Sequence, residues 1–281
     1  MSRDHVIEET GILAWCFLPC DSRWRRHDPW GNRLLITAGK TFTASDMVEM
    51  RRRHFDVWES PLDALRHAAG LIACRVRLSD TIERVGFPRY YRPITAEGVG
   101  RIERLYANEF HVLWTADVAF TIHRFTCDLA ARLLERERTA GREPDERAWA
   151  VVIARQEWLE GRLRDEEMQR VWTAFEAARR QQYQQRPPIQ CGIPYGGIKH
   201  VEWSTHAGAL MTVETATKPV PFTSFMSVEN AKRVISSVVR GTLLWPPEGR
   251  SEQRIEQQMA NLQVMNADLD QRLNDAYRRS I

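Results

Sequence analysis

Lysine is scarce in this sequence of 281 residues: four of the 40 basic residues are lysine, which leaves 36 arginines. The 37 acidic residues bring the formal net charge to only +3, which is too close to balance to indicate binding to a polyanion. The planar guanidinium fork of arginine suits phosphate and carboxylate groups. GC-rich codon usage explains the same composition, so the arginine content by itself assigns no function.

Cysteine is also scarce, and the number of cysteines is odd. The five cysteines are too scattered for a disulfide framework and fit a reducing compartment. A zinc site near the N-terminus would need a fourth ligand and tighter pairing than Cys16, Cys20 and His27 offer. We therefore predict neither a metal nor another cofactor, and we interpret Cys16 as a small buried side chain.

Long hydrophobic runs are absent. The N-terminal stretch lacks the apolar segment of about seven or more residues that a signal peptide requires, and no run reaches the roughly twenty residues of a membrane span. The sequence predicts a cytoplasmic protein without a membrane partner, or one incorporated into a virion that is assembled in the cytoplasm.

The first part of the chain has the patterns of β-structure. Apolar runs at residues 12–18 and 33–37 flank a turn-like segment at 28–32, which predicts a strand pair. Ser60 and Pro61 then open a short helix that Gly70 is expected to close. The alternating residues that follow, 71–78, predict another strand.

Beyond Pro93 the periodicity becomes helical. We expect a helix along Val118 to Leu133, a second from Pro144 to Gly161, and a third around residues 168–175. Prolines 187 and 188 end this region. The predicted fold class is α+β, with an α+β domain at 1–186 whose second half is helical, a small α+β segment at 187–249, and a C-terminal coiled-coil helix at 250–281. In the middle segment, residues 198–203 and 209–215 are predicted strands and 227–241 a helix.

The C-terminal segment has the spacing of a coiled-coil helix. Apolar residues and one asparagine recur at alternating steps of four and three, at Ile255, Met259, Leu262, Asn266, Leu269, Leu273 and Ala276. An asparagine at a seam position pairs with its twin in parallel two-stranded coiled coils. The pattern predicts a parallel homodimer, favoured over a trimer. The alternative is a helix that folds back on its own chain.

Two basic clusters are candidate contacts to nucleic acid. They are Arg23, Trp24, Arg25, Arg26, Arg51, Arg52 and Arg53. Arginine interleaved with an aromatic ring is typical of single-strand binding, in which phosphate contacts combine with base stacking. A solvated face neutralised by nearby acidic residues is the alternative interpretation. His111 and His123, on apolar faces, fit core or boundary histidines better than general bases.

Four blocks carry a resemblance to uncharacterised proteins from phages, prophages and high-GC bacteria. The blocks are Ala38-Gly-Lys-Thr-Phe42, residues 60–79, residues 112–127, and Ala140-Gly-Arg-Glu-Pro-Asp145 with Trp158-Leu159. They cover roughly residues 10–180 in order. The resemblance implies a fold and a genomic setting, with phage structural proteins as partners, but no activity.

A fainter resemblance is to ADP-ribosyltransferase folds. It rests on the helix that carries Ala64 and His67 and on the strand from Cys74 to Leu78 that follows it. In that family, a pocket beside this helix-to-strand connection holds NAD. No histidine, tyrosine and glutamate can be placed in that family's roles. The sequence therefore predicts a non-enzymatic, homo-oligomeric assembly or accessory protein. The alternatives are an NAD-using transferase and a nucleic-acid-binding dimer.

Overall fold

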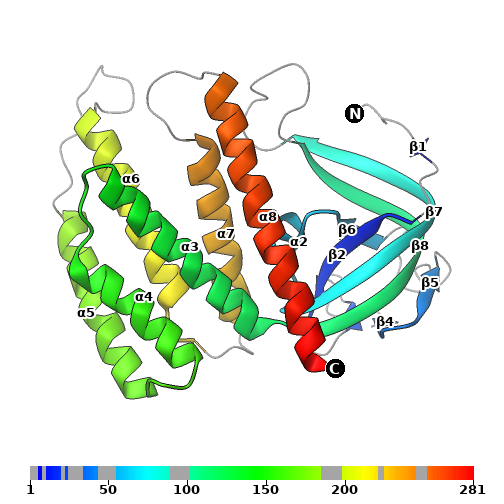
Figure 1. Ribbon diagram of the computed structural model, residues 1–281, viewed down its shortest axis with the longest axis horizontal. Helices are drawn as coiled ribbons and strands as arrows, with labels where there is room; N and C mark the ends of the chain where they lie inside the picture. The colour runs from blue at the N-terminus through cyan, green and yellow to red at the C-terminus, as the bar shows by residue number, and fades with distance from the viewer. Residues whose placement is uncertain are drawn as a thin grey trace. The chain divides into compact units, whose positions relative to one another are not determined.

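The computed structural model shows an α+β protein whose chain divides into two compact units (Figure 1). The β-unit comprises residues 1–119 and 265–281, and the helical unit comprises residues 120–264. None of the described helices is long and apolar enough to cross a membrane. The structure describes residues 6–7, 11–19, 23–24, 34–43, 55–88, 101–184, 198–220, 225–244 and 252–281.

A six-stranded antiparallel sheet forms the β-unit. Its order is β1 (Val6–Ile7), β7 (Ile72–Pro88), β2 (Leu13–Leu18), β6 (Phe55–Trp58), β8 (Arg101–Asp117) and β5 (Thr41–Thr43). The long strands β7 and β8 also pair with each other from Ile72↔Asp117 to Pro88↔Arg101 (Figure 1). Because β2 joins β7 to β6, and β6 joins β8, the pairings β7–β2–β6–β8–β7 close into a ring.

Alternate residues of the strands point to one face of the sheet, and this face carries the core of the β-unit. Successive side chains of a strand point to opposite faces, so every second residue faces inward. The buried cluster is made in this way of Ala14, Cys16 and Leu18 from β2, Cys74, Val76 and Leu78 from β7, and Leu105, Ala107, Phe110 and Val112 from β8, with Ile36, Phe42 and Val57.

The predicted pairing of residues 12–18 with 33–37 is wrong. β2 pairs with β7 and β6, whereas β4 (Leu34–Leu35) pairs with β3 (Arg23–Trp24) in a separate two-stranded sheet. The apolar run of β2 is buried on both faces, from Ala14 to Leu18. β2 has β7 on one edge and β6 on the other, and both partners lie far from it in the sequence, where a local turn pattern gives no signal.

The short helix α2 (Pro61–Arg66) begins as predicted. The Ser60 hydroxyl accepts a hydrogen bond from the Asp63 amide at 3.2 Å, and Pro61 occupies the first turn. The helix ends earlier than predicted, with His67 as its C-cap. Gly70 has a different role: a Cβ there would lie 2.3 Å from the Leu18 carbonyl oxygen, so this position brings the chain against β2.

Three predicted helices of the helical unit are confirmed as α3 (Ala119–Thr139), α4 (Glu146–Leu159) and α5 (Asp165–Gln184). The Asp145 carboxylate accepts from the Arg147 amide and caps α4. Gly161, with φ of +72°, follows the end of α4 as expected. α4 packs on α5 and α6 (Figure 1).

The two strands predicted at 198–203 and 209–215 are wrong, since both lie in one helix, α6 (Ile198–Thr217). Threonine, which is β-branched, favours strands in general. Three threonines of α6 instead donate to the carbonyl four residues earlier, Thr212 to Gly208, Thr215 to Met211 and Thr217 to Val213. The described part of the middle segment therefore contains helices and no strand, and the predicted boundary near 186 lies outside the described residues.

The last two helices are α7 (Phe225–Leu244) and α8 (Glu252–Ser280). α7 contains the predicted 227–241 helix but starts earlier, so Ser227 lies inside it and does not cap it. α8 confirms the predicted C-terminal helix. It passes from the helical unit to the β-unit between Val264 and Met265.

We expect Gly70→Ala to lower the free energy of unfolding by about 2–3 kcal/mol, because the added Cβ meets backbone atoms of Leu18 and Pro19 that cannot move aside. Urea denaturation measures this change. The matched control is Gly208→Ala on α6, where nothing lies within 4 Å and alanine is the better helix former. Equal effects of the two substitutions would contradict the expectation.

Candidate functional site

The second half of α8 docks on the β-unit through three polar or aromatic side chains. The first is Asn266, whose side-chain oxygen accepts hydrogen bonds from the Ser60 hydroxyl at 2.7 Å and from the Leu62 amide at 3.2 Å. Ser60 is also the N-cap of α2. Asn266 therefore joins α8 directly to the start of α2.

Asp270, one turn further on, contacts the outer face of β2 and β7. Its carboxylate accepts from the Trp15 indole at 3.1 Å and lies 3.8 Å from the Arg75 guanidinium. Trp15 and Arg75 are direct cross-strand partners, and the guanidinium lies 4.4 Å from the Trp15 ring centroid. Burial lowers the pKa of Arg75, and the charge of Asp270 opposes this shift. The carboxylate thus partly neutralises a cation held against an aromatic ring.

Tyr277 completes the contact two turns beyond Asp270. Its ring stacks on Trp114, with centroids 4.7 Å apart and planes inclined by 5°. Trp114 in turn meets Trp15 edge to face at 5.3 Å. Between these anchors, Leu269 and Leu273 are fully buried. Asn266, Asp270, Leu273 and Tyr277 follow one another at steps of four, three and four, so one helix face makes the docking surface.

For this half of α8, the fold-back alternative is what the structure shows. Leu269 and Leu273 are buried in the chain's own β-unit, and the Asn266 side chain bonds Ser60 and Leu62, so none of them is available to a twin helix in this arrangement. Ala276 is half-buried and Leu262 is buried. The side chains of Ile255 and Met259 lie outside the described part of the chain. Self-association stays a prediction.

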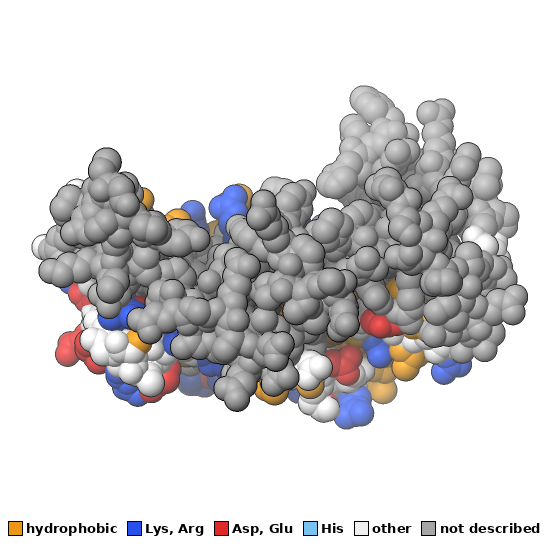
Figure 2. Space-filling model, turned by 90° about the horizontal axis from the view of Figure 1, so that it is seen from above, with side chains coloured by type: hydrophobic (Ala, Val, Ile, Leu, Met, Phe, Trp, Pro, Cys, Tyr) orange, Lys and Arg blue, Asp and Glu red, His pale blue; other side chains and the backbone are white. Residues whose placement is uncertain are grey.

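Most of the predicted nucleic-acid contacts lie outside the described residues, namely Arg25, Arg26, Arg51, Arg52 and Arg53. Arg23 and Trp24 are placed only by their backbone, as strand β3. Elsewhere, exposed arginines pair with acidic neighbours, as in Arg147 with Asp145 and Arg180 with Glu176. In the space-filling view, described side chains of both charges lie side by side (Figure 2). Nucleic-acid binding therefore stays a prediction.

The residues that prompted the transferase alternative have structural partners. The Ser60 hydroxyl is used by Asp63 and Asn266. The His67 ring stacks on Trp58, with centroids 4.9 Å apart and planes inclined by 3°. These contacts fix the ends of α2 against the sheet and α8, and no reaction follows from them.

The helical unit contains a second candidate, a buried histidine and serine. His123 on α3 and Ser227 on α7 lie 2.5 Å apart, from Nε2 to Oγ, and both are buried. Burial, helped by the positive charge of Arg155, lowers the pKa of His123 to about 3, so the imidazole is neutral at physiological pH. Enclosed on all sides, this pair acts as a contact between helices, which agrees with the predicted core histidine.

A buried carboxylate forms an ionic cluster in the helical unit. Glu137 is fully buried, and Arg142 donates to both of its oxygens, at 2.7 and 3.1 Å, while His206 Nδ1 lies 3.3 Å away. Burial raises the pKa of Glu137, but the hydrogen bonds from His206 and Arg142 outweigh it and hold the pKa at about 2. The end of α3, the following loop and α6 are thereby tied together.

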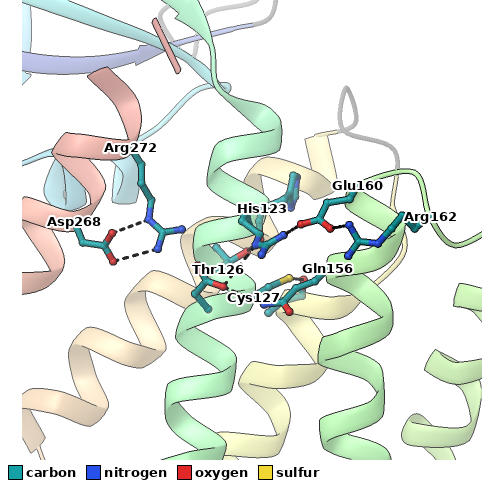
Figure 3. A network of polar contacts seen from close by, with 11 residues as sticks. His123, Thr126, Cys127, Gln156, Glu160, Arg162, Asp268 and Arg272 are labelled. Atoms are coloured by element: carbon teal, nitrogen blue, oxygen red, sulfur yellow. Dashed lines mark hydrogen bonds and ion pairs between the residues drawn. The ribbon is translucent and has the colours of Figure 1, made fainter. Parts of the chain in front are cut away.

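Polar contacts also join α3 to the end of α4. The Glu160 carboxylate pairs with Arg162 (Figure 3) and also with Arg124. Gln156 donates to Asp128 at 3.0 Å. On α8, the Asp268 and Arg272 side chains pair at 2.7 Å. No group of three or more His, Cys, Asp or Glu side chains suited to a metal occurs among the described residues.

Comparisons with protein-family models, with curated proteins and with solved structures found no match to this chain. The resemblance to phage and prophage proteins therefore stays a prediction. Among the described contacts, the docking surface of α8 is the one most specific in its chemistry. Trp15, Arg75, Trp114, Asp270 and Tyr277 were not predicted as site residues, because Asp270 and Tyr277 lie off the heptad seam and the other three lie in strands.

We expect Asn266→Ala to destabilise the protein by about 2 kcal/mol, because the Ser60 hydroxyl and the Leu62 amide both lose their acceptor. Urea denaturation measures the loss, and hydrogen exchange should report fraying of residues 265–281. The control is Gln271→Ala, an exposed residue that bonds only Asp275 on the same helix. The control should change stability by less than about 0.5 kcal/mol, and a similar loss in both variants would contradict the docking role.

Glu137→Gln should remove stability that depends on pH. The folded-state pKa lies below the unfolded value, so the carboxylate stabilises the protein above about pH 4.5, and this contribution is lost as the pH falls towards about 2. The difference in free energy of unfolding between wild type and variant should be on the order of 3 kcal/mol at pH 7 and shrink below pH 4.5. The control is Glu135→Gln, an exposed residue paired with Arg138. A difference for Glu137→Gln that is constant with pH would refute the assignment.

Proposed function

We propose that this chain is a non-enzymatic, homo-oligomeric accessory protein of the phage and prophage type, in which the β-unit is a receptor for the C-terminal helix. The observation that carries the proposal is the set of specific partners for one helix face. Asn266 meets the cap of α2, Asp270 meets Trp15 and Arg75, and Tyr277 meets Trp114.

A receptor of this kind selects its helix by position as well as by hydrophobicity. Leu269 and Leu273 supply apolar burial, which many amphipathic helices would supply equally well. The Asn266 and Asp270 contacts fix where on the β-unit these leucines are buried. A one-residue shift would leave the Arg75 guanidinium without its carboxylate, and an uncompensated, partly buried charge is costly.

Exchange of the helix between copies would produce the oligomer. The helix returns to the β-unit after the whole helical unit, residues 120–264. The identical contacts can form with the β-unit of a second copy, and exchange of identical elements is a low-cost route to dimers. Such a dimer reconciles the seam-like spacing of α8 with its occupied docking surface.

The phage and prophage setting rests on the resemblance of the sequence blocks alone. Residues 38–42, 60–79 and 112–117 fall on or beside β5, α2, β7 and β8. These elements belong to the β-unit. The other matched residues, 120–127, 140–145 and 158–159, lie on or beside α3 and α4, so the resemblance covers parts of both units. Phage structural proteins are accordingly the partners we propose for the assembled oligomer.

Cross-linking between differently substituted chains tests the exchange. One chain carries Glu59→Cys and the other, lengthened by a tag, carries Ala267→Cys; both residues are exposed and adjoin the Ser60–Asn266 hydrogen bond. Cys20 and Cys191 are replaced by serine in both, since the other three cysteines are buried. After co-expression and treatment with a flexible bis-maleimide, exchange gives a cross-linked heterodimer.

The matched control is one chain that carries both substitutions. Docking within a single chain gives an internal cross-link there and no heterodimer from the mixed chains. If that pattern is found and light scattering shows a monomer at all concentrations, the oligomer proposal is wrong. Each chain that carries only one of the two introduced cysteines is also treated alone, and any cross-linked dimer it forms measures the background from random collisions.

A further inference from the structure

Two cysteines face each other across neighbouring strands in the core of the β-unit. Cys16 on β2 and Cys74 on β7 are direct partners in the antiparallel register. Such partners have Cα atoms about 4.5–5.5 Å apart with side chains on the same face, within the range of about 4.4–6.8 Å that a disulfide spans. Both side chains belong to the buried cluster of the core.

The pair differs from the other described cysteine, Cys127. All three thiols are reduced and buried. Cys127 lies on α3 in the helical unit, where its sulfur contacts the Ala216 carbonyl oxygen at 3.9 Å. Burial therefore applies to all three, but only Cys16 and Cys74 have a second sulfur as a direct neighbour. Cys20 and Cys191 lie outside the described residues.

We propose that Cys16 and Cys74 form a redox couple, which a low-molecular-weight disulfide converts into a cross-strand disulfide bond. One cysteine thiolate attacks a sulfur of the oxidant, forms a mixed disulfide and expels one thiolate. The second cysteine thiolate attacks the protein sulfur of that mixed disulfide and expels the other. The two cysteines lose two protons and two electrons, and the oxidant becomes two thiols.

The surroundings of the pair make this reaction slow and dependent on pH. The neighbouring Cys16 thiol, together with burial, raises the pKa of Cys74 well above its usual range, so thiolate is scarce at neutral pH. The oxidant reaches the sulfurs only when β2 separates locally from β7. Oxidation should therefore accelerate about tenfold per pH unit below the thiol pKa, and also in mild denaturant.

The bond would lie directly behind the docking surface. Trp15 precedes Cys16 on β2, and Arg75 follows Cys74 on β7. The two side chains are partners on the opposite face, where they hold Asp270. A covalent link between residues 16 and 74 fixes the spacing of β2 and β7 beneath these side chains. The proposal itself does not depend on the receptor function.

The test uses the full-length chain with oxidised glutathione at pH 8.5 in urea below the unfolding transition. The incubation continues, with urea raised stepwise, until Cys127 begins to be modified. Remaining thiols are blocked with N-ethylmaleimide, and a non-reducing digest is analysed by mass spectrometry. We expect a peptide pair joined through Cys16 and Cys74 as the main product, formed before Cys127 reacts.

Two variants separate pairing from simple reactivity. Cys127→Ser should leave the Cys16–Cys74 link unchanged, and Cys16→Ser should give a glutathione adduct on Cys74 in its place. Stable glutathione adducts on Cys16 and Cys74 of the wild-type chain would overturn the proposal. Disulfide links from Cys16 or Cys74 to other cysteines would overturn it as well. The same holds if Cys16 and Cys74 are both still reduced when Cys127 is already modified.

Discussion

The pairing of β2 with β7 is the interaction on which the β-unit depends. It closes the ring of strands through β6 and β8, and it decides which residues of both strands share a face. Cys16 and Cys74 thereby face the core, and Trp15 and Arg75 face outward together. A shift by one residue would exchange these two sets and place a guanidinium in the apolar interior.

The outward face carries Trp15, a large aromatic side chain that would be exposed to water if no other element packed on it. In the folded chain Trp15 is fully buried. The cover is the second half of α8, which is separated from β2 by most of the chain. Its Asp270 carboxylate satisfies the Trp15 indole and offsets the Arg75 charge, while Leu269 and Leu273 exclude water. Polar anchors within an apolar contact fix its register, as in specific interfaces between proteins.

The helical unit solves a different problem, that of polar groups buried among helices. Glu137 is held as a carboxylate by Arg142 and His206, and His123 is held neutral beside Ser227. Both arrangements satisfy groups that would otherwise be costly in an apolar interior. In the same way, Asp270 on α8 offsets the charge of Arg75 in the β-unit.

The sequence by itself determined the elements whose signals are local. Helical periodicity predicted α3, α4, α5 and α8, and the serine and proline at residues 60 and 61 predicted the start of α2. Only the tertiary structure decided what α8 packs against, because a seven-residue spacing describes one apolar face and carries no information about its partner. The same holds for α6, where threonines that favour strands bond back to their own helix, and for Cys16 and Cys74, which become neighbours only when β2 pairs with β7. Periodicity is set by neighbours along the chain, whereas these contacts join residues far apart in it.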